Sequence, residues 1–406
     1  MHSQTPVDDV RTALIVSSLF HGINDGTFAI LPAVLPFAVK DFLLSYFDIG
    51  LLYAAMMLII VIFQPITGAL ADRFDELDLL AIGGSLIFVA CVMLFYTSSY
   101  IQLFLLNLLY AVGYSVYHPV SYTVLSRISH GVTYRTKAMG LSGSVGDLGN
   151  FSTFISTGFI AVYLGWRFPF LLWGILAFLG TIVYIVFLRR RRVSAVAMEH
   201  RTDPSQKSRQ RGRTGRRHLA LIVTLFIFLG ALYRTFIGFT TLYLTDVIHL
   251  TPANSDYLFS AFVLFGVIGA FLSGYIAEHL GLERALILEF AAVSACMLLL
   301  YLDFIQTFPL VALPLVVGGL ALYATYPALY SFTADFRTFG KRGFSYGILA
   351  STTFAGGFAV SLLNGQIADL TASLSTVYLL GGVMALIAAL TADSLRRNAN
   401  PTRECD

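Results

Sequence analysis

The second half of the chain repeats the first, and both halves are strongly apolar. Four pairs of positions recur at a spacing of 206 to 208 residues, namely Gly68 with Gly274, Asp72 with Glu278, Pro119 with Pro327, and Gly158 with Gly365. Repeated segments of this kind predict two similar structural units that pack against each other. In membrane proteins built from such repeats, a binding site lies between the units near the bilayer midplane.

The composition places both units in a membrane. Hydrophobic residues make up 57% of the 406 residues, charged residues make up 12%, and the mean hydropathy is +0.77, whereas about a quarter of the residues of a soluble chain are charged. A membrane-spanning helix needs roughly 20 apolar residues, so twelve spans use about 240 and leave short loops and one longer connector. We predict an all-α membrane protein with twelve transmembrane helices in two pseudo-symmetric six-helix bundles.

One segment interrupts the apolar pattern near the middle of the chain. Residues 189–217 carry eleven Lys and Arg, two acidic residues and no apolar periodicity, which is typical of a solvated linker. The predicted organisation is an N-terminal six-helix bundle at 1–192, a basic cytoplasmic linker at 193–217 and a C-terminal six-helix bundle at 218–406. The linker is expected to set the topology of the chain; the alternative is contact with anionic lipid headgroups.

The placement of the basic residues predicts the orientation. With a cytoplasmic N-terminus, 23 of the 26 Lys and Arg fall on the cytoplasmic side, Lys40 and Arg167 fall on the far side, and Arg234 falls inside a span. The positive-inside rule therefore favours a multi-pass protein of the cell inner (cytoplasmic) membrane with both termini in the cytoplasm. Basic residues at helix ends, rather than on one soluble face, argue against nucleic acid as a partner.

The sequence contains no enzyme or metal motif. Cys91 and Cys296 lie in apolar spans and Cys405 lies in the tail, which leaves no disulfide framework and no metal-ligand pattern. Neither a zinc-binding His-Glu-x-x-His nor a glycine-rich phosphate loop followed by Lys occurs. We expect no cofactor, no metal and no enzyme activity.

Six ionisable residues lie inside the predicted spans, where each costs roughly 2.5 to 3.5 kcal/mol to insert and therefore needs a partner or a function. They are His21, Asp25, His118, Asp147, Arg234 and Glu289. His21 and Asp25 are four residues apart and share a helix face, with Asn24 beside them. The helical rise of about 1.5 Å per residue puts His118 and Asp147 at a depth comparable to that of His21. Glu289 is close to the cytoplasmic surface and is interpreted as structural.

These residue types suit the binding of protons and of an anion. A carboxyl group or an imidazole at this depth can carry a coupling proton, and the guanidinium fork of Arg234 suits carboxylate, phosphate or phosphonate groups. The alternatives are a structural ion pair that holds the halves together and simple neutralisation of Asp25 or Asp147 by Arg234. Three aromatic residues with hydroxyl groups are candidates for lining the same cavity, Tyr233, Tyr326 and Tyr330.

Pro119 and Pro327 occupy equivalent positions of the two halves, inside predicted spans. Each removes a backbone hydrogen bond to the carbonyl group four residues earlier, on Ser115 and on Tyr323. A fixed kink and a flexible gating point shared by both halves are the two interpretations.

The segment from Gly68 to Asp72 and Arg73 resembles the motif after the second span of the major facilitator superfamily, and the segment from Gly274 to Glu278 is similar to its weaker echo after the eighth span. This resemblance extends over nearly the whole chain. It implies a charge cluster at the cytoplasmic helix ends that latches the outward-open state. The candidate gating residues are therefore Gly68, Asp72, Arg73, Pro119, Glu278 and Pro327. Residues 74–78 are Phe-Asp-Glu-Leu-Asp where the motif continues with Gly and basic residues, which implies a rewired or weak latch.

Three further segments resemble the fosmidomycin-resistance branch of that superfamily. They are His21-Gly-Ile-Asn24-Asp25, Ser115-Val-Tyr117-His118-Pro119 and Gln366-Ile-Ala368-Asp369. Members of this branch are thought to export a phosphonate drug in exchange for protons, and the resemblance implies that His21, Asp25 and His118 belong to the cavity and the proton pathway. The chain departs from the branch at Val120, where a glutamate is usual, and at Asp147, because the fifth span of the branch is uncharged.

The leading hypothesis is a secondary active transporter that exports a small organic anion or drug by proton antiport through alternating access, with substrate and proton competing at Asp25, Asp147 and Arg234. The first alternative is a proton-coupled or facilitated importer of an organic acid or similar metabolite in the same fold. The second is a membrane sensor or scaffold, which should carry an additional soluble module that the sequence does not show. The expected partners are a small anionic substrate, protons and membrane lipids, and the expected state is a monomer.

Overall fold

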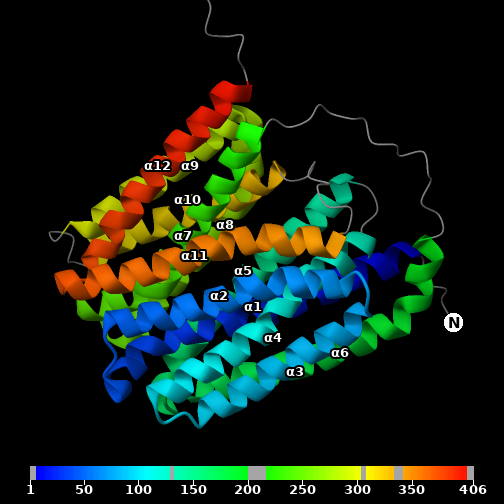
Figure 1. Cartoon of the computed structure of the whole chain (residues 1–406), viewed down its shortest axis with the longest axis horizontal. Helices are drawn as coiled ribbons and strands as arrows, with labels where there is room; N and C mark the ends of the chain where they lie inside the picture. The colour runs from blue at the N-terminus through cyan, green and yellow to red at the C-terminus, as the bar shows by residue number, and fades with distance from the viewer. Residues whose placement is uncertain (1–5, 129–131, 200–215, 303–307, 333–341, 400–406) are drawn as a thin grey trace, which may run out of the picture.

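The computed structural model describes residues 6–128, 132–199, 216–302, 308–332 and 342–399, which form twelve α-helices and no strand (Figure 1). The helices of the first half are α1 (Pro6–Phe42), α2 (Tyr46–Ala71), α3 (Glu76–Phe95), α4 (Tyr100–Ile128), α5 (Val132–Tyr163) and α6 (Phe168–Glu199). Those of the second half are α7 (Arg216–Asp246), α8 (Pro252–Leu280), α9 (Leu282–Tyr301), α10 (Phe308–Ser331), α11 (Arg342–Thr371) and α12 (Ser375–Ala399). The predicted all-α architecture with twelve long helices is confirmed.

The starts of two helices follow directly from their local sequence. Ser45 caps α2 in a capping box, in which the Asp48 carboxylate accepts from the Ser45 backbone N–H at 3.0 Å. Asp75 caps α3 and accepts from the Leu77 backbone N–H at 2.8 Å. The acidic stretch after the first motif therefore serves to start α3, which is a local reason for its departure from the superfamily pattern.

Ten of the described helices are long and apolar enough to cross a membrane. The other two are α5 and α11, which contain many Gly, Ser and Thr residues. They pack in the interior, α5 against α1 and α8, and α11 against α2 and α7, where small residues let helices approach closely. Other helices expose large apolar side chains, such as Val183 of α6, Leu313 of α10 and Leu390 of α12, as expected of a surface that faces lipid.

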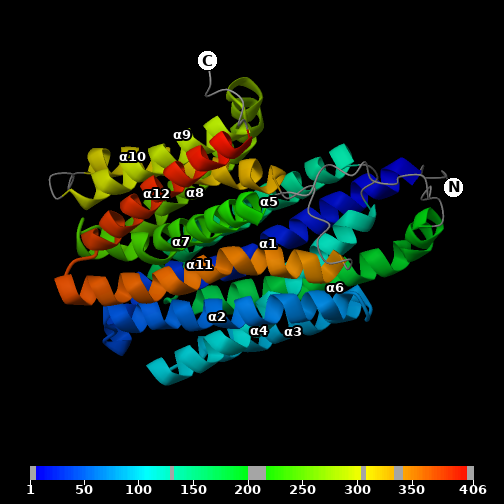
Figure 2. The ribbon, with the colours of Figure 1, turned by 45° about the horizontal axis from the view of Figure 1, so that its top comes forward.

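Helix packing is repeated between the halves. In the first half α1 packs against α5, α2 against α4, and α3 against α4 and α6; in the second half α7 packs against α11, α8 against α10, and α9 against α10 and α12. The sequence repeat is thus also a structural repeat. Two further pairs, α2 with α11 and α5 with α8, join the halves and are equivalent to each other by the same repeat. Figures 1 and 2 show α2 and α11 side by side.

The two joining contacts use equivalent glycines. Gly365 of α11 packs onto the carbonyl oxygen of Tyr46 in α2, and Gly158 of α5 packs onto the carbonyl oxygen of Ala253 in α8. A Cβ atom at Gly365 would lie 2.5 Å from the Tyr46 oxygen, so a larger residue would force the helices apart. The two glycines are 207 residues apart, and so are the two residues that they touch. This offset defines the register between the halves.

Odd-numbered helices start at the end of the bundle that carries the start of α1, here called the terminal end, and they run to the distal end. Several contacts near the distal end join the halves, among them Thr241 Oγ1 to the Pro32 oxygen at 3.0 Å, the Tyr46 N–H to Asp369 at 2.9 Å, and the Phe154 and Phe259 rings with centroids 4.6 Å apart. Toward the terminal end, α12 diverges from the first half (Figures 1 and 2). There, Cβ atoms built at Gly140, Gly143 and Gly274 would have no heavy atom within 4 Å. The halves are therefore closed at the distal end and part between α5 and α8 toward the terminal end.

The helices on either side of the predicted linker extend further than expected. α6 continues to Glu199 and α7 begins at Arg216, so both reach into the predicted linker at 193–217, and residues 200–215 lie outside the described residues. Arg, Ala and Met are strong helix formers, so a helix can continue past the apolar segment into water. The boundaries of the two bundles and of the linker stay predictions.

Candidate functional site

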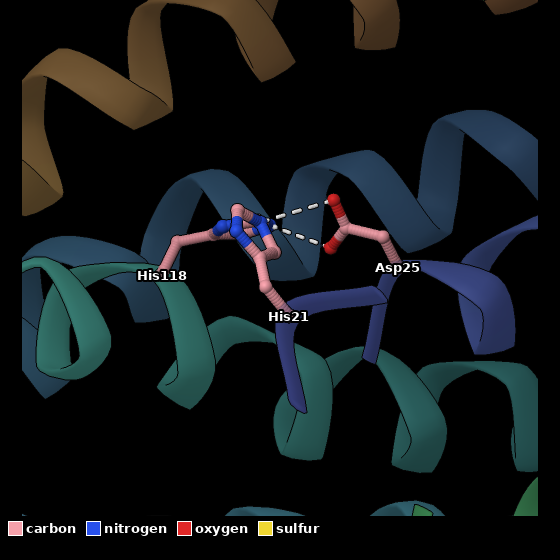
Figure 3. Close-up of side chains that lie close together, drawn as sticks. All are labelled: His21, Asp25 and His118. Carbon is pink, nitrogen blue, oxygen red and sulfur yellow. Dashed lines mark ion pairs between the residues drawn. The ribbon is translucent and has the colours of Figure 1, made fainter. Parts of the chain in front are cut away.

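Three ionisable side chains from two helices meet between α1 and α4. His21 Nε2 lies 3.1 Å from Asp25 Oδ2, and His118 Nε2 lies 3.5 Å from Asp25 Oδ1 (Figure 3). The spacing of four residues places His21 and Asp25 on one face of α1, and α4 brings His118 to the same carboxylate. The His21 side chain is 2% exposed, whereas 15% of the Asp25 side chain and 11% of the His118 side chain are exposed. This histidine-aspartate cluster is therefore buried at His21 and accessible at Asp25.

Glycines of α5 allow α1 to position the cluster. A Cβ atom at Gly149 would overlap the carbonyl oxygen of Gly22, and a Cβ atom at Gly146 would lie 2.7 Å from Asp25 Oδ2. Glycine in a helix costs roughly 0.5 to 1 kcal/mol relative to alanine, and here it permits two helix backbones to touch. The close contact of α1 and α5 thus sets the place of the Asp25 carboxylate.

Polar neighbours complete the cluster, and the sequence analysis missed two of them. The Tyr114 hydroxyl lies 3.0 Å from His118 Nε2 and donates to Asp25 Oδ1 at 3.3 Å. Ser142 Oγ lies 2.9 Å from His21 Nδ1, and Asn24 Nδ2 donates to Asp25 Oδ1 at 3.2 Å. Tyr114 precedes His118 by four residues on the same face of α4, which is the signal that could have identified it. Ser142 is one of many serines and has no such signal.

The cluster holds the atoms that a metal ion would need. Within the described chain, one nitrogen or oxygen from each of His21, Asp25 and His118 lies within 4.8 Å of the other two. The distances of 3.1 and 3.5 Å between the imidazole nitrogens and the Asp25 carboxylate are those of ion pairs, so protons on the histidines are sufficient to account for the arrangement. The expected absence of a metal stays a prediction.

Arg234 is buried in an aromatic cage at the contact between the halves. Its side chain is 2% exposed, and Cζ lies 4.6 Å from the ring centroid of Phe28 on α1 and 5.4 Å from that of Tyr53 on α2. Nε and Nη1 have no hydrogen-bond partner. Among the described residues no carboxylate pairs with Arg234, so the alternative of neutralisation by Asp25 or Asp147 is not formed in this conformation. The ring faces stabilise the cation but leave its donors unsatisfied.

The predicted tyrosines form a second group across α7 and α10. The ring centroid of Tyr233 lies 5.5 Å from that of Tyr323 and 5.6 Å from that of Tyr326. Asp147 of α5 is half-buried and lies within electrostatic reach of these three tyrosines and of Asp25. Tyr330 lies further along α10, where its ring meets those of Phe226 and Tyr326. Asp147 is therefore close enough to interact electrostatically with both the tyrosine group and the histidine-aspartate cluster.

The two copies of the predicted gating motif differ in what they contact. Asp72 Oδ2 accepts from the backbone N–H of Phe344 at 3.1 Å, which ties the end of α2 to the start of α11. Gly68 is buried and accepts from the Asp72 N–H at 3.3 Å, whereas Arg73 is exposed beside a hollow of about 310 Å³. In the second copy, Glu278 is exposed and makes no ion pair among the described residues. Only the first copy bridges the halves in this part of the structure.

The carbonyl groups near the two prolines are bonded to neighbouring helices. The Ser115 oxygen, which Pro119 deprives of a helical partner, accepts from Thr67 Oγ1 of α2 at 3.0 Å. Near Pro327, the carbonyl oxygen of Ala324 accepts from Ser273 Oγ of α8 at 2.8 Å. Side chains of neighbouring helices commonly satisfy such groups in membranes. The fixed kink and the gating point both stay predictions.

Two acidic residues lie buried without partners. Asp256 of α8 is 0% exposed and Glu289 of α9 is 5% exposed, and among the residues that the structure describes none of their four carboxylate oxygens has a hydrogen-bond partner. Glu289 was expected close to the cytoplasmic surface, and no arginine pairs with it among the described residues. Asp256 was not among the candidate residues, because it lies only four residues after the first residue of α8, and an acid near a helix end is ordinarily solvated.

Comparison with known proteins agrees with the fold. The sequence profile of the Major Facilitator Superfamily matches residues 15–302 and 223–404. The chain is 25% identical over 386 residues to the fosmidomycin resistance protein of Escherichia coli, covering 92% of this chain and 90% of that protein. It is 24% identical over 357 residues to the quinolone resistance protein NorA of Staphylococcus aureus, covering 83% and 84%. It is 22% identical over 378 residues to the hexuronate transporter of Bacillus subtilis, covering 87% of each.

Solved structures share the architecture. The TM-score is 0.72 with a bacterial homologue of the human lysosomal transporter Spinster in an inward-facing, occupied conformation, at 15% identity and covering 97% of this chain and 98% of that chain. It is 0.70 with a variant of the nucleoside transporter NupG, at 14% identity and covering 95% and 99%. The match to the fosmidomycin resistance protein confirms the predicted resemblance to that branch. The chain therefore belongs to the Major Facilitator Superfamily and is a multi-pass membrane transporter, not an enzyme.

Proposed function

We propose that this protein exports a small organic anion or drug in exchange for protons by alternating access. The observation that carries the proposal is the buried guanidinium of Arg234, whose Nε and Nη1 donors have no partner. A buried donor left unpaired costs about 1 to 3 kcal/mol. A carboxylate, phosphate or phosphonate group bound there satisfies both donors and neutralises the buried charge.

The histidine-aspartate cluster supplies a proton site next to this anion site. Phe28, whose ring lies beneath Arg234, follows Asp25 by three residues on α1, which is less than one helical turn. Tyr114 connects the two sites, because its hydroxyl donates to Asp25 and its ring stacks on the ring of Phe28, with centroids 4.8 Å apart. A proton gained or lost in the cluster is therefore felt at the anion site.

Electrostatics constrain the substrate that such a pair of sites can exchange for protons. A proton on the cluster adds positive charge near Arg234 and so strengthens the binding of a ligand whose only polar group is an anion. Proton and ligand then bind together, which gives co-transport. Exchange requires that the ligand also place a hydrogen-bond donor or a cation on Asp25, where it displaces the proton. We therefore propose a substrate with an acidic group for Arg234 and a donor group for Asp25.

The second candidate function is proton-coupled import of an organic acid, and the same geometry favours it if the ligand has only the acidic group. Relatives of both kinds support keeping the two candidates: the fosmidomycin and quinolone resistance proteins on one side, and the hexuronate transporter on the other. The distribution of basic residues supports an inner-membrane location with the terminal end in the cytoplasm. A monomer is sufficient, because both sites lie within one chain.

The proposal is tested in proteoliposomes with an imposed pH gradient, with fosmidomycin, a quinolone and a hexuronate as probes. Exchange predicts that one of the first two is driven against its gradient while protons move the opposite way. Asp25→Asn and Asp147→Asn should each reduce gradient-driven transport, with Glu289→Gln as the matched control outside the proposed site. Full gradient-driven transport in both variants refutes the proton sites. Movement of protons together with the probe refutes exchange and selects the second candidate.

A further inference from the structure

We infer that Asp256 is a second proton site, one that takes up a proton from the distal side when the two halves close there. Asp256 lies in the second turn of α8, at the contact with α5 that joins the halves. A Cβ atom built at Gly158 of α5 would lie 3.3 Å from Asp256 Cβ. The Asp256 side chain is 0% exposed, and neither carboxylate oxygen has a hydrogen-bond partner in the described part of the chain.

No charged group among the described residues compensates this carboxyl group. The helices that pack against α8 are α1, α5, α7, α9 and α10. The charged side chains at the distal ends of α1 and α7 have other neighbours: Asp41 pairs with Arg167, Asp246 accepts from the Tyr46 hydroxyl, and Lys40 lies near Asp246. The nearest titratable side chain on α8 is Tyr257, which is partly exposed and lies against Gly158. Asp256 is thus an acid surrounded by helix contacts and without a counter-ion.

The repeat shows that packing does not require an acid at this position. The offset of 207 residues that relates Tyr46 to Ala253 also relates Ile49 of α2 to Asp256 of α8. Ile49 is likewise 0% exposed, at the equivalent contact between α2 and α11. The equivalent contact therefore forms around an apolar side chain. Packing therefore does not need the carboxyl group of Asp256, and burying that group is unfavourable unless it is protonated and neutral.

Two other acids show that Asp256 is a distinct case. Asp369 also bridges the halves at the distal end, but its carboxylate accepts from the backbone N–H groups of Tyr46 and Phe47 at 2.9 Å each. Glu289 is buried without a partner, but its helix packs only within the second half, chiefly against α10 and α12. Among these three, Asp256 alone is both unpartnered and placed where the halves must separate.

The consequence is a dependence of distal closure on protons. When α5 and α8 separate at the distal end, water reaches Asp256 and the carboxyl group ionises at ordinary pH. Closure then requires either burying an isolated carboxylate, which costs several kcal/mol, or first adding a proton. The neutral acid is therefore the form that closes. Since one proton is taken up, the ratio of closed to open molecules rises up to tenfold for each unit by which the distal pH falls.

This inference rests on the proposed function in one respect, namely that the distal contact opens during alternating access. With the terminal end in the cytoplasm, the distal side is the outer side. A proton taken up there favours the return of an empty exporter to the state that is open toward the cytoplasm. The central cluster and Asp256 then respond to opposite sides of the membrane, the cluster in this conformation and Asp256 when the distal contact is open.

The experiment measures the distal gap directly and needs no substrate. A full-length variant without Cys91, Cys296 and Cys405 is labelled with spin probes at Tyr163→Cys and Asn254→Cys, the exposed distal ends of α5 and α8. Pulsed electron resonance in lipid nanodiscs gives the distance distribution between pH about 8 and about 5. The closed, short-distance population should grow as the pH falls, by up to tenfold in its ratio to the open population for each pH unit.

Variants assign the response to one residue. Asp256→Asn, which resembles the neutral acid, should be closed at every pH, whereas Asp256→Glu should keep the response and so show that the site tolerates substitution. Glu289→Gln should leave the response unchanged. A parent protein without pH response, an unchanged response in Asp256→Asn, or loss of the response in Glu289→Gln would each overturn the inference. Failure of proton exchange in liposomes leaves these outcomes unaffected, so the two proposals fail separately.

Discussion

Replacing Arg234 by methionine should strongly weaken anion binding and leave the unliganded protein about as stable as the parent. The guanidinium is buried without a carboxylate partner among the described residues, and exchanging a buried charge for an apolar side chain of similar size is often neutral or stabilising by about 1 to 4 kcal/mol. Loss of the cation–π contacts with Phe28 and Tyr53 removes about 0.5 to 2 kcal/mol of stabilisation each and so offsets this gain. The two effects nearly cancel, so the melting temperature of the empty protein should change little.

The effect on the ligand should be large. Hydrogen bonds to a charged group contribute about 1.5 to 3 kcal/mol each, and Arg234 offers two unpartnered donors. Their loss should weaken the binding of an anionic ligand by about 3 to 6 kcal/mol, which is roughly 100-fold to 10,000-fold in the dissociation constant. Thermal unfolding of purified protein in a titration of fosmidomycin, or of another anion found by screening, measures both quantities, because a ligand of the folded form raises the melting temperature.

Two comparisons make this experiment decisive. Arg234→Lys keeps the charge but not the planar fork, so it should retain part of the affinity. Phe262→Ala truncates a fully buried ring outside the site and should cost about 3 to 5 kcal/mol of stability. If Arg234→Met destabilises the empty protein as much as Phe262→Ala does, the guanidinium has a structural role. If Arg234→Met binds the anion as tightly as the parent does, the anion site lies elsewhere.

Three further predictions concern packing, the latch and metal. Gly149→Ala should lower the melting temperature and the transport rate, because its Cβ atom would overlap the Gly22 oxygen and overpacking costs about 1 to 3 kcal/mol. Gly140→Ala, whose Cβ atom has open space around it, should lower neither quantity. Equal effects of the two substitutions would contradict the packing argument. Asp72→Ala should speed hydrogen exchange at the start of α11 by removing the hydrogen bond to the Phe344 N–H, whereas Arg73→Ala should not. Faster exchange in Arg73→Ala than in Asp72→Ala would refute the assignment of the latch to Asp72. A chelator should leave proton-driven transport unchanged, and a loss of transport that zinc restores would show that the histidine-aspartate cluster holds a metal.

The polar residues of α1 show what could be predicted from a sequence. The pairing of His21 with Asp25 follows from helical geometry alone, because side chains four residues apart share a face. His118 could be placed at the same depth but not in contact, because depth along a helix says nothing of which face is turned inward. The structure brings its Nε2 atom to 3.5 Å from Asp25. Tyr114 then follows from His118 by the same rule of four residues.

Other parts of the site depended on relations between helices. The partner of Arg234 was left open between a substrate and the carboxylates of Asp25 and Asp147, and the structure surrounds the guanidinium with aromatic rings instead. Asp256 and Glu289 appear in sequence as acids near span ends, and only burial distinguishes them from solvated ones. Their lack of partners is a property of neighbouring helices whose rotation no local pattern encodes.

The amino-acid sequence by itself determined the class of fold, the number of helices and the repeat. A bilayer imposes these through local requirements, since each span must satisfy its own backbone and be apolar over about 20 residues. The tertiary structure decided which polar side chains share a site, which acids stay without a partner and at which end the halves meet. Those outcomes depend on helix rotation and tilt, which are set where glycines such as Gly149, Gly158 and Gly365 let particular helices touch.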